Sequence, residues 1–412
     1  MLLIKGAEVY APEYLGKKDV LIAGEKIERI GEDLPEYEGC QVIDGTGRIV
    51  APGFIDRHVH ITGGGGEGSF HTQAPQVQLS DLIRGGVTTV VGLLGTDGIS
   101  RSTENLVAKA KALKEEGISA YCCCGAYGHP GPTITGSISR DIMFVDEIIG
   151  LKLAVSDHRA PNITVDELIR LGSDVRTAGM LSGKAGFVCL HLGGDDRALS
   201  PVFEALERTS IPVKTFQPTH VGRAKKLQED AFKLAKMGGT IDFTCGQFEE
   251  KIKELAASLR AAKEAGVPMD KVTISSDGQG SWSNYDAAGN LTEMGVSSVD
   301  TMYRQVVYQV QNENMSLEEA LSLGTRNVAK ALEVYPKKGA VHEGSDADVL
   351  VLNGDLSMNT VIARGSLMMQ DGVLLKKGTY EAELLKGAPG QLGKTGNRSI
   401  PRRKICRIIG DF

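Results

Sequence analysis

The sequence lacks any run of about 18 consecutive apolar residues, the length that a membrane-spanning helix requires. Its first residues, MLLIKGAEVY, carry Lys5 and Glu8 within the only apolar start, so they do not fit a secretion signal. An excess of positive charge is also lacking, because the formal net charge is −6. We therefore expect a cytoplasmic protein that binds small molecules and has neither nucleic acid nor a membrane as a partner.

Cysteine is too scarce and too irregularly placed for a disulfide framework. The chain has 7 cysteines in 412 residues, and Cys122, Cys123 and Cys124 are adjacent. On a strand, the first and third of these would face one side and the second the other, so three thiols do not meet locally. We expect reduced cysteines that pack within a strand layer, with metal binding or redox chemistry as the alternative.

Both ends of the chain are rich in short strands separated by turn residues. Residues 2–10, 19–30, 41–44 and 48–50 have this pattern, and it returns at 348–352, 360–363 and 372–375. The two ends therefore predict one small β domain, formed by residues 1–52 together with 340–380.

The middle of the chain, residues 53–339, repeats a strand followed by an amphipathic helix eight times. The candidate strands are short and apolar enough to be buried on both faces. They cover residues 53–61, 87–94, 120–126, 150–155, 186–192, 213–219, 240–245 and 272–276. Residues 164–167 and 316–319 have the pattern of capping boxes at helix starts. The predicted fold class is α/β, with a (β/α)8 TIM-like barrel of about 250 residues as the main domain.

Histidines and carboxylates gather at the carboxyl ends of these strands, where the reactive groups of such barrels lie. His58 and His60 close the first strand, and side chains two apart on a strand face the same side. The other candidates come from separate strands: Lys152 on the fourth, His191 on the fifth, His220 on the sixth and Asp277 on the eighth. Four of the eight histidines therefore converge on one mouth, which predicts a metal site there.

Several motifs make the sequence resemble the amidohydrolase superfamily, and within it the bacterial isoaspartyl dipeptidases. They are APGFIDRHVH at 51–60, GGGGE at 63–67, GLLGTD at 92–97, SDHR at 156–159, PTH at 218–220, SSDG at 275–278 and GSDAD at 344–348. The resemblance covers nearly the whole chain up to about residue 380. It implies the barrel with a small β-sandwich, and it implies a homo-oligomer.

The resemblance further implies two divalent metal ions, usually zinc, that share a hydroxide. Lys152 would carry carbon dioxide as a carbamate and bridge the ions, because a carbamate has two oxygens where a bare ammonium has no lone pair. His58, His60 and Asp277 would bind one ion, and His191 and His220 the other. Other divalent metals accept the same ligands.

The implied reaction is hydrolysis of a β-aspartyl dipeptide to aspartate and an amino acid. Asp277 would move the proton, and Tyr127 would stabilise the oxyanion. One carboxylate and two guanidinium groups match a substrate with one ammonium and two carboxylates. By resemblance, the substrate would contact Glu67 and Thr96 at its aspartyl part and Arg159, Arg223 and Ser281 at its leaving part, with Gly65 in a glycine run that admits close approach.

Two other functions remain open from the sequence. A cyclic-amide hydrolase, of the dihydroorotase or hydantoinase kind, would share the metal centre, although the run at 63–67 argues against it. A non-catalytic scaffold with the same fold is the second alternative, and such proteins usually lack the ligands that are present here. The glycine-rich, basic tail at 386–412 falls outside the resemblance; disorder is expected there, with a reading-frame scar or an oligomer contact as alternatives.

Overall fold

A computed structural model of the protein describes residues 1–160 and 163–381. The chain divides into two compact units, residues 1–378 and 379–412, and the architecture below is that of the first unit. The tail predicted at 386–412 lies outside the described residues. Within the first unit, the division into residues 1–52 plus 340–380 and residues 53–339 stays a prediction.

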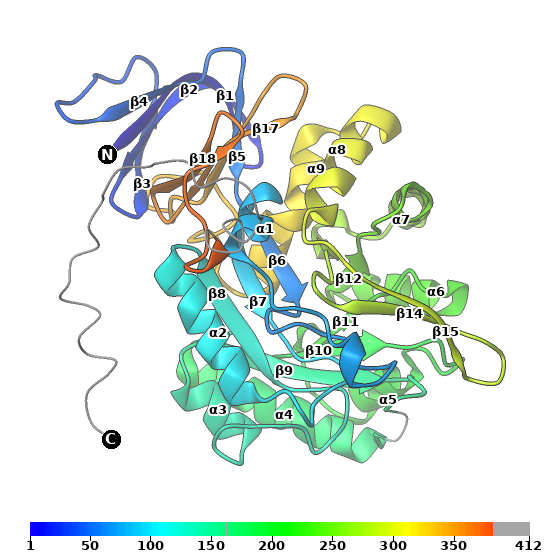
Figure 1. The fold of residues 1–412 in the computed structure, drawn as a ribbon. Coiled ribbons are helices and arrows are strands. Elements are labelled where there is room, and N and C mark those ends of the chain that lie inside the picture. Colours follow the sequence, from blue (N-terminus) through cyan, green and yellow to red (C-terminus); the bar gives the residue numbers. More distant parts are fainter. Residues whose placement is uncertain (161–162, 382–412) are drawn as a thin grey trace, which may run out of the picture. The chain divides into compact units, whose positions relative to one another are not determined.

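The centre of the first unit is formed by parallel strands, as expected for an α/β fold. Six of them pair in the order β11-β10-β9-β8-β7-β6, and two more pair as β12-β13. Their bounds are β6 (Phe54–Val59), β7 (Val87–Gly92), β8 (Ser119–Gly125), β9 (Ile148–Val155), β10 (Phe187–Leu192), β11 (Phe216–Thr219), β12 (Ile241–Thr244) and β13 (Val272–Ser275). The long parallel sheet is curled (Figure 1).

Hydrogen bonds link the two parallel sheets at both of their edges. The amide of Val221, after β11, donates to the carbonyl of Asp242 on β12 at 3.3 Å, and Val59 on β6 forms a parallel bridge with Gly278, after β13. The strands are buried along their whole length, because apolar residues face both the interior and the surrounding helices. The carboxyl ends of β6, β9, β10, β11 and β13 therefore open toward one region.

Amphipathic helices cover the outer side of the parallel sheets; α2 contacts β8, and α4 contacts β9 and β10 (Figure 1). Thr164 and Glu167 form the predicted capping box at the start of α4. The helices are α1 (Leu79–Arg84), α2 (Thr103–Glu116), α3 (Ile138–Phe144), α4 (Val165–Ser182), α5 (Ser200–Arg208), α6 (Lys225–Lys236), α7 (Glu249–Glu264), α8 (Thr301–Glu313), α9 (Leu317–Gly324) and α10 (Arg326–Ala331), with short 3₁₀ turns at Phe70–Thr72, Val213–Thr215 and Met269–Lys271.

The two ends of the chain pair with each other, as predicted. They form one mixed nine-stranded sheet in the order β19-β18-β17-β16-β5-β1-β2-β3, with β4 added beside β1. The strands are β1 (Leu2–Tyr10), β2 (Tyr14–Ala23), β3 (Lys26–Gly31), β4 (Gln41–Asp44), β5 (Ile49–Pro52), β16 (Val349–Leu352), β17 (Met358–Ala363), β18 (Ser366–Gln370) and β19 (Val373–Leu374). A sandwich of two separate sheets stays a prediction.

Some predicted element bounds were wrong. The strand expected at 213–219 begins at Phe216, because the amide of Thr215 bonds the carbonyl of Pro212 at 2.9 Å and closes a 3₁₀ turn. Only one of the two hydrogen bonds of the capping box expected at 316–319 is present: the Ser316 hydroxyl accepts from the Glu319 amide. The Glu319 carboxylate binds Lys263 at 2.8 Å instead of the Ser316 amide. The hairpin of β14 (Ser281–Tyr285) and β15 (Leu291–Val296) was missed, because neither strand has a buried residue and so neither shows a buried apolar face.

The three adjacent cysteines lie on β8 and are fully buried, in agreement with packing inside a strand layer. The cysteines of the described part of the chain, these three with Cys40, Cys189 and Cys245, form no disulfide. Burial raises the pKa of the Cys122, Cys123 and Cys124 thiols, which keeps them protonated and unreactive. Across the described ranges 1–160 and 163–381, no helix has the length and apolar character needed to cross a bilayer.

Candidate active site

The six predicted metal ligands lie at the carboxyl ends of five strands and are all buried. They are His58 on β6, His60 after it, Lys152 on β9, His191 on β10, His220 after β11 and Asp277 after β13, and each is between 1% and 8% exposed. Residues from positions 58 to 277 of the chain are thereby brought to one place, as the strand-end argument predicted.

His58, His60 and Asp277 form the tightest cluster. Oδ1 of Asp277 lies 3.1 Å from Nε2 of His60 and 3.4 Å from Nε2 of His58. One ligand atom from each residue falls within 4.8 Å of the other two, a spacing that suits a metal ion. Nε2 of both histidines faces Asp277 and is the nitrogen that such an ion would use, while Nδ1 of both is buried and has no hydrogen-bond partner among the described residues.

His191 and His220 lie beside this cluster. The ring of His220 is 4.9 Å from the ring of His58 and 4.6 Å from the ring of His191, measured between centroids. Nδ1 of His220 lies 2.5 Å from the hydroxyl of Thr244 on β12. That contact occupies one nitrogen of His220 and leaves Nε2 available to a metal.

Lys152 reaches into the same cluster from β9. Its Nζ lies 3.1 Å from Nε2 of His58 and 5.8 Å from the ring centre of Tyr127. Burial lowers the pKa of Lys152, so the neutral amine is more accessible than in an exposed lysine. A neutral amine is the form that reacts with carbon dioxide, so the surroundings of Lys152 suit carbamate formation.

The protonation of the cluster also fits a bound cation. Burial, together with nearby positive groups, holds the pKa of His58, His191 and His220 well below the ordinary histidine value. Neutral imidazoles keep the lone pairs that metals bind. Together with the carboxylate of Asp277, these imidazoles make a donor set that fits divalent metal ions.

The loops that follow the strands place these side chains with unusual backbone conformations. His220 and Asp277 have φ values of 63° and 53°, a region that costs free energy for residues other than glycine. Gly280 permits close packing here, since a Cβ on it would lie 2.7 Å from Oδ1 of Asp277 and 2.8 Å from Cδ2 of His60. Such local strain is common at functional sites.

Glu67 connects the predicted substrate residues. Its carboxylate accepts from the hydroxyl of Thr96 at 3.1 Å and from the hydroxyl of Ser281 at 2.9 Å, and it lies 3.6 Å from Nη1 of Arg159. Gly65 precedes it with φ 81°, and a Cβ there would lie 2.4 Å from the carbonyl oxygen of Thr72. The four loops that carry these residues therefore meet at one point.

Tyr127 and Arg223 both contact His191, which lies beside the His58–His60–Asp277 cluster. The hydroxyl of Tyr127 lies 2.8 Å from Nδ1 of His191, and Nη1 of Arg223 lies 3.0 Å from Nε2. Burial raises the pKa of Tyr127, which keeps its hydroxyl a neutral hydrogen-bond donor. The guanidinium of Arg159 stacks over the Tyr127 ring at 5.1 Å from its centre.

Sequence reasoning gave no role to two residues that the site uses. Asp157 follows β9 and contacts both Arg159 and His191, and Thr244 contacts His220. Asp157 is a carboxylate at a strand end, so the rule that selected Asp277 would also have found it. Thr244 carries no comparable signal, because a threonine at a strand end is common in any fold.

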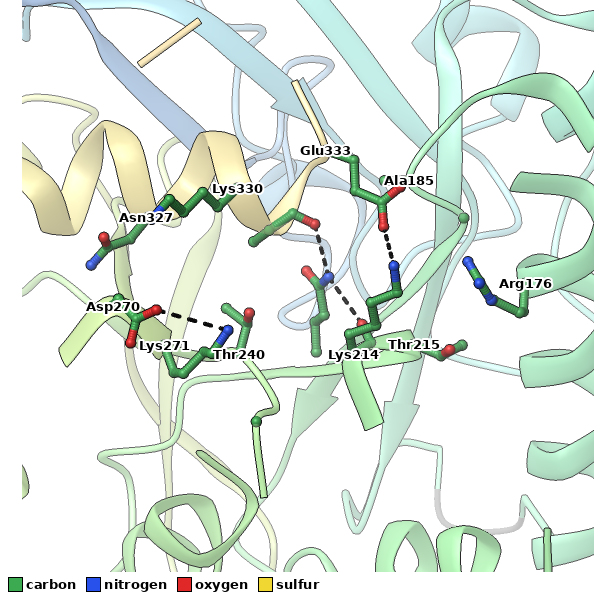
Figure 2. Close-up of a pocket in the computed structure, with 14 residues that line it drawn as sticks. Arg176, Ala185, Lys214, Thr215, Thr240, Asp270, Lys271, Asn327, Lys330 and Glu333 are labelled. Atoms are coloured by element: carbon green, nitrogen blue, oxygen red, sulfur yellow. Dashed lines mark hydrogen bonds and ion pairs between the residues drawn. The ribbon is translucent and has the colours of Figure 1, made fainter. Parts of the chain in front are cut away.

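A pocket lies at the amino ends of β10 to β13, opposite to the strand ends that carry the predicted metal ligands (Figure 2). Its lining includes the cations Arg176, Lys214, Lys271 and Lys330 and the acids Asp270 and Glu333. Lys214 pairs with Glu333 at 2.6 Å, and Lys271 lies 3.9 Å from Asp270. None of the predicted site residues lines this pocket, so the candidate chemistry is confined to the other end of the strands.

Solved structures resemble this chain over nearly its whole length. A β-aspartyl dipeptidase from Fervidobacterium islandicum AW-1, in complex with β-Asp-Leu dipeptide, is 43% identical, with a TM-score of 0.85, over 90% of this chain and 98% of that one. A model of the amidohydrolase family matches residues 186–378. The chain belongs to the amidohydrolase family. A more distant solved structure shares the fold: a dihydropyrimidinase from Brevibacillus agri NCHU1002 is 18% identical with a TM-score of 0.64, over 91% of this chain and 96% of that one.

Curated relatives match a shorter part of this amidohydrolase. A dihydroorotase from Listeria monocytogenes serotype 4a (strain HCC23) is 30% identical over 177 residues, which cover 39% of this chain and 38% of that protein. A dihydroorotase from Lactobacillus leichmannii is 38% identical over 114 residues, 28% of this chain and 26% of that protein. The matched regions therefore cover well under half of the length of each of these two relatives.

Proposed function

We propose that this amidohydrolase hydrolyses the amide bond of β-aspartyl dipeptides and releases aspartate and an amino acid. The observation that carries the proposal is the pairing of Glu67 with Arg159, and the contact of both Arg159 and Arg223 with His191, beside the His58–His60–Asp277 cluster. One carboxylate and two guanidinium groups complement a ligand that has one ammonium and two carboxylates. The 43% identity to a dipeptidase bound to β-Asp-Leu supports the same substrate class.

Substrate binding follows from these charges. The carboxylate of Glu67 would accept from the substrate ammonium, with Thr96 and Gly65 beside the aspartyl part. Arg159, Arg223 and Ser281 would hold the carboxylate of the leaving amino acid. An α-aspartyl dipeptide places its amide one carbon closer to the ammonium, so it would not span the same groups with its scissile bond at the cluster.

Two divalent ions, zinc or another metal that accepts the same ligands, would make a water nucleophilic near neutral pH and polarise the substrate carbonyl. His58, His60 and Asp277 would hold one ion, and His191 and His220 the other. Lys152, carrying carbon dioxide as a carbamate, would supply an oxygen to each. The expected homo-oligomer and cytoplasmic location belong to the same proposal.

The chain's own residues would handle the proton and the developing charge. Asp277 would accept the proton of the attacking water and deliver it to the departing amine. Tyr127, whose hydroxyl is a neutral donor, would hydrogen-bond the carbonyl oxygen as it becomes negative. The buried surroundings exclude bulk water, which strengthens both interactions.

Hydrolysis of a cyclic amide is the second candidate, and the dihydroorotase relatives favour it. The metal ligands would be the same, but a planar ring has no ammonium to pair with Glu67. The scaffold alternative has less support, because the full set of ligand types is present and buried.

A substrate panel separates these functions. The purified protein, supplied with zinc, cobalt or manganese, is assayed for release of aspartate from β-Asp-Leu, with α-Asp-Leu and dihydroorotate as the matched alternatives. We expect release from β-Asp-Leu and at most traces with the other two. Ring opening of dihydroorotate without dipeptide hydrolysis would replace our proposal by the cyclic-amide one, and inactivity on all three with every metal would favour the scaffold.

A further inference from the structure

Asp157 is a buried carboxylate that joins a predicted metal ligand to a predicted substrate residue. It is 2% exposed and lies two residues after the end of β9. Its Oδ1 accepts from the amide and Nε of Arg159 at 2.8 and 2.9 Å, and its Oδ2 accepts from Nη2 at 2.8 Å. The same Oδ2 lies 2.9 Å from Nε2 of His191. Asp157 thus fixes the orientation of both side chains at once.

The loop after β9 is built to hold this carboxylate in place. Ser156 has φ 55°, and its hydroxyl donates to the carbonyl of Ala198 at 2.9 Å. Gly193, after the neighbouring strand β10, allows the loops to touch, because a Cβ on it would lie 2.5 Å from Cα of Asp157. The position of Asp157 is therefore set by the fold as well as by its own hydrogen bonds.

The groups around His191 determine the role of each ring nitrogen. Nε2 has Nη1 of Arg223 at 3.0 Å and Nη2 of Arg159 at 3.3 Å, and two guanidinium groups would repel a metal ion there. Guanidinium groups have no lone pair, so Asp157 is the acceptor for a proton on Nε2. Nδ1, at 2.8 Å from the Tyr127 hydroxyl, is then an acceptor, and its one lone pair would bind a metal in place of that hydroxyl.

We propose that Asp157 is a positioning residue that holds His191 with its proton on Nε2, so that Nδ1 is the metal-binding atom, and that also anchors the Arg159 guanidinium. A carboxylate behind a metal-binding histidine is a known way to fix its tautomer and orientation. The role of Arg159 toward substrate rests on the function proposed above, whereas the histidine part does not. Metal binding and substrate binding would then be linked through one side chain.

The first measurement is made on the metal-free protein. Long-range proton–nitrogen NMR correlations of ¹⁵N-histidine report which ring nitrogen carries the proton, and His191→Gln identifies the His191 signals by their loss. We expect the Nε2–H form in the wild type and a mixture of tautomers in Asp157→Asn. An Nδ1–H form in the wild type, with Nε2 accepting from Arg223, would overturn the proposal whether or not the protein hydrolyses dipeptides.

The second measurement compares variants by metal affinity, using competition with a chelator. Asp157→Asn should weaken zinc binding about 10- to 100-fold, the usual effect of losing such a partner. Arg159→Met should leave zinc binding within about twofold while raising KM for β-Asp-Leu, since His191 keeps its carboxylate. Asp157→Asn should show both effects, and Asp157→Glu should restore part of the zinc affinity.

Asp195→Asn is the matched control. Asp195 accepts from the amide and Nε of Arg197 at 2.8 and 3.2 Å, the same local arrangement without a histidine partner. Zinc affinity should not change in this variant, and circular dichroism confirms that each variant is folded. Zinc affinity that is equal in Asp157→Asn and in the wild type would contradict the proposal. If β-Asp-Leu is not hydrolysed at all, the NMR and zinc results still decide the role of Asp157.

Discussion

Lys152 and Lys338 are both buried lysines, and their surroundings are opposite. Neither is more than 3% exposed. Nζ of Lys338 lies 2.6 Å from Asp348 and 2.9 Å from Asp346. Nζ of Lys152 faces Nε2 of His58 at 3.1 Å and has no ion pair among residues 1–160 and 163–381. The carboxylates raise the pKa of Lys338 although burial opposes them, whereas burial lowers the pKa of Lys152.

The two buried lysines differ in whether the fold pairs them with carboxylates. A buried ammonium costs several kcal/mol unless it is paired, and the two carboxylate partners of Lys338 offset that cost. Lys152 without a carboxylate destabilises the protein as long as it remains a bare ammonium. A residue kept at such a cost is expected to serve the reaction, as a carbamate would.

Replacing Lys152 is expected to have the largest effect on activity, because Lys152 is the buried lysine without a carboxylate partner. Lys152→Met should abolish nearly all dipeptide hydrolysis and most metal binding, because the bridging oxygens are lost. The unfolding free energy of the metal-free protein should stay equal or rise, since an unpaired cation is removed. Addition of short-chain carboxylates to Lys152→Ala should restore part of the activity. A fully active variant would refute the bridging role.

Asp277→Asn removes the proposed proton carrier while keeping its shape. We expect kcat to fall by about 10²- to 10⁴-fold, the range for general acid–base groups, with part of the bound metal retained. Steady-state hydrolysis of β-Asp-Leu measures the effect. A loss of less than about tenfold would mean that another group moves the proton.

Arg223 and Arg176 lie at opposite ends of the parallel strands, so their replacement gives a matched pair of variants. Arg223→Met should raise KM for β-Asp-Leu about 10- to 100-fold, because a hydrogen bond to a charged group is worth roughly 1.5–3 kcal/mol. Arg176→Met, in the pocket of Figure 2, should leave kcat and KM unchanged. Equal effects of the two variants would remove Arg223 from the substrate site.

Lys338→Met should have the smallest effect on activity and a clear effect on stability. The buried carboxylate of Asp348 would lose its ion-pair partner, whereas Asp346 would keep Lys26, and we expect a cost of about 3–5 kcal/mol of unfolding free energy near pH 7. The raised pKa of Lys338 makes its contribution complete below pH 10.5, and the contribution is lost as pH rises through the higher folded value. The lowered pKa of Asp346 means a loss at acid pH, below its ordinary value of 3.8. Denaturant unfolding across pH measures this, and kcat per folded chain should not change.

The sequence predicted the parts of this site that depend on local pattern. His58, His60, His191 and Asp277 were found because strands end where a periodic apolar run meets a polar residue. The positive φ values of His220 and Asp277, and the contact of Ser281 with Glu67, depend on loops that are far apart in the chain. Local pattern carries no information on such contacts, so neither they nor the exposed β14–β15 hairpin could be predicted.

The most direct test of the account is the number of metal ions per chain, measured by elemental analysis of the purified protein and of Lys152→Met after saturation with zinc and removal of excess. We expect two ions in the wild type and a clear loss in the variant, alongside an unchanged fold. A wild type that binds no metal, or a variant that binds as much as the wild type, would contradict the claim that these six residues form a two-metal centre.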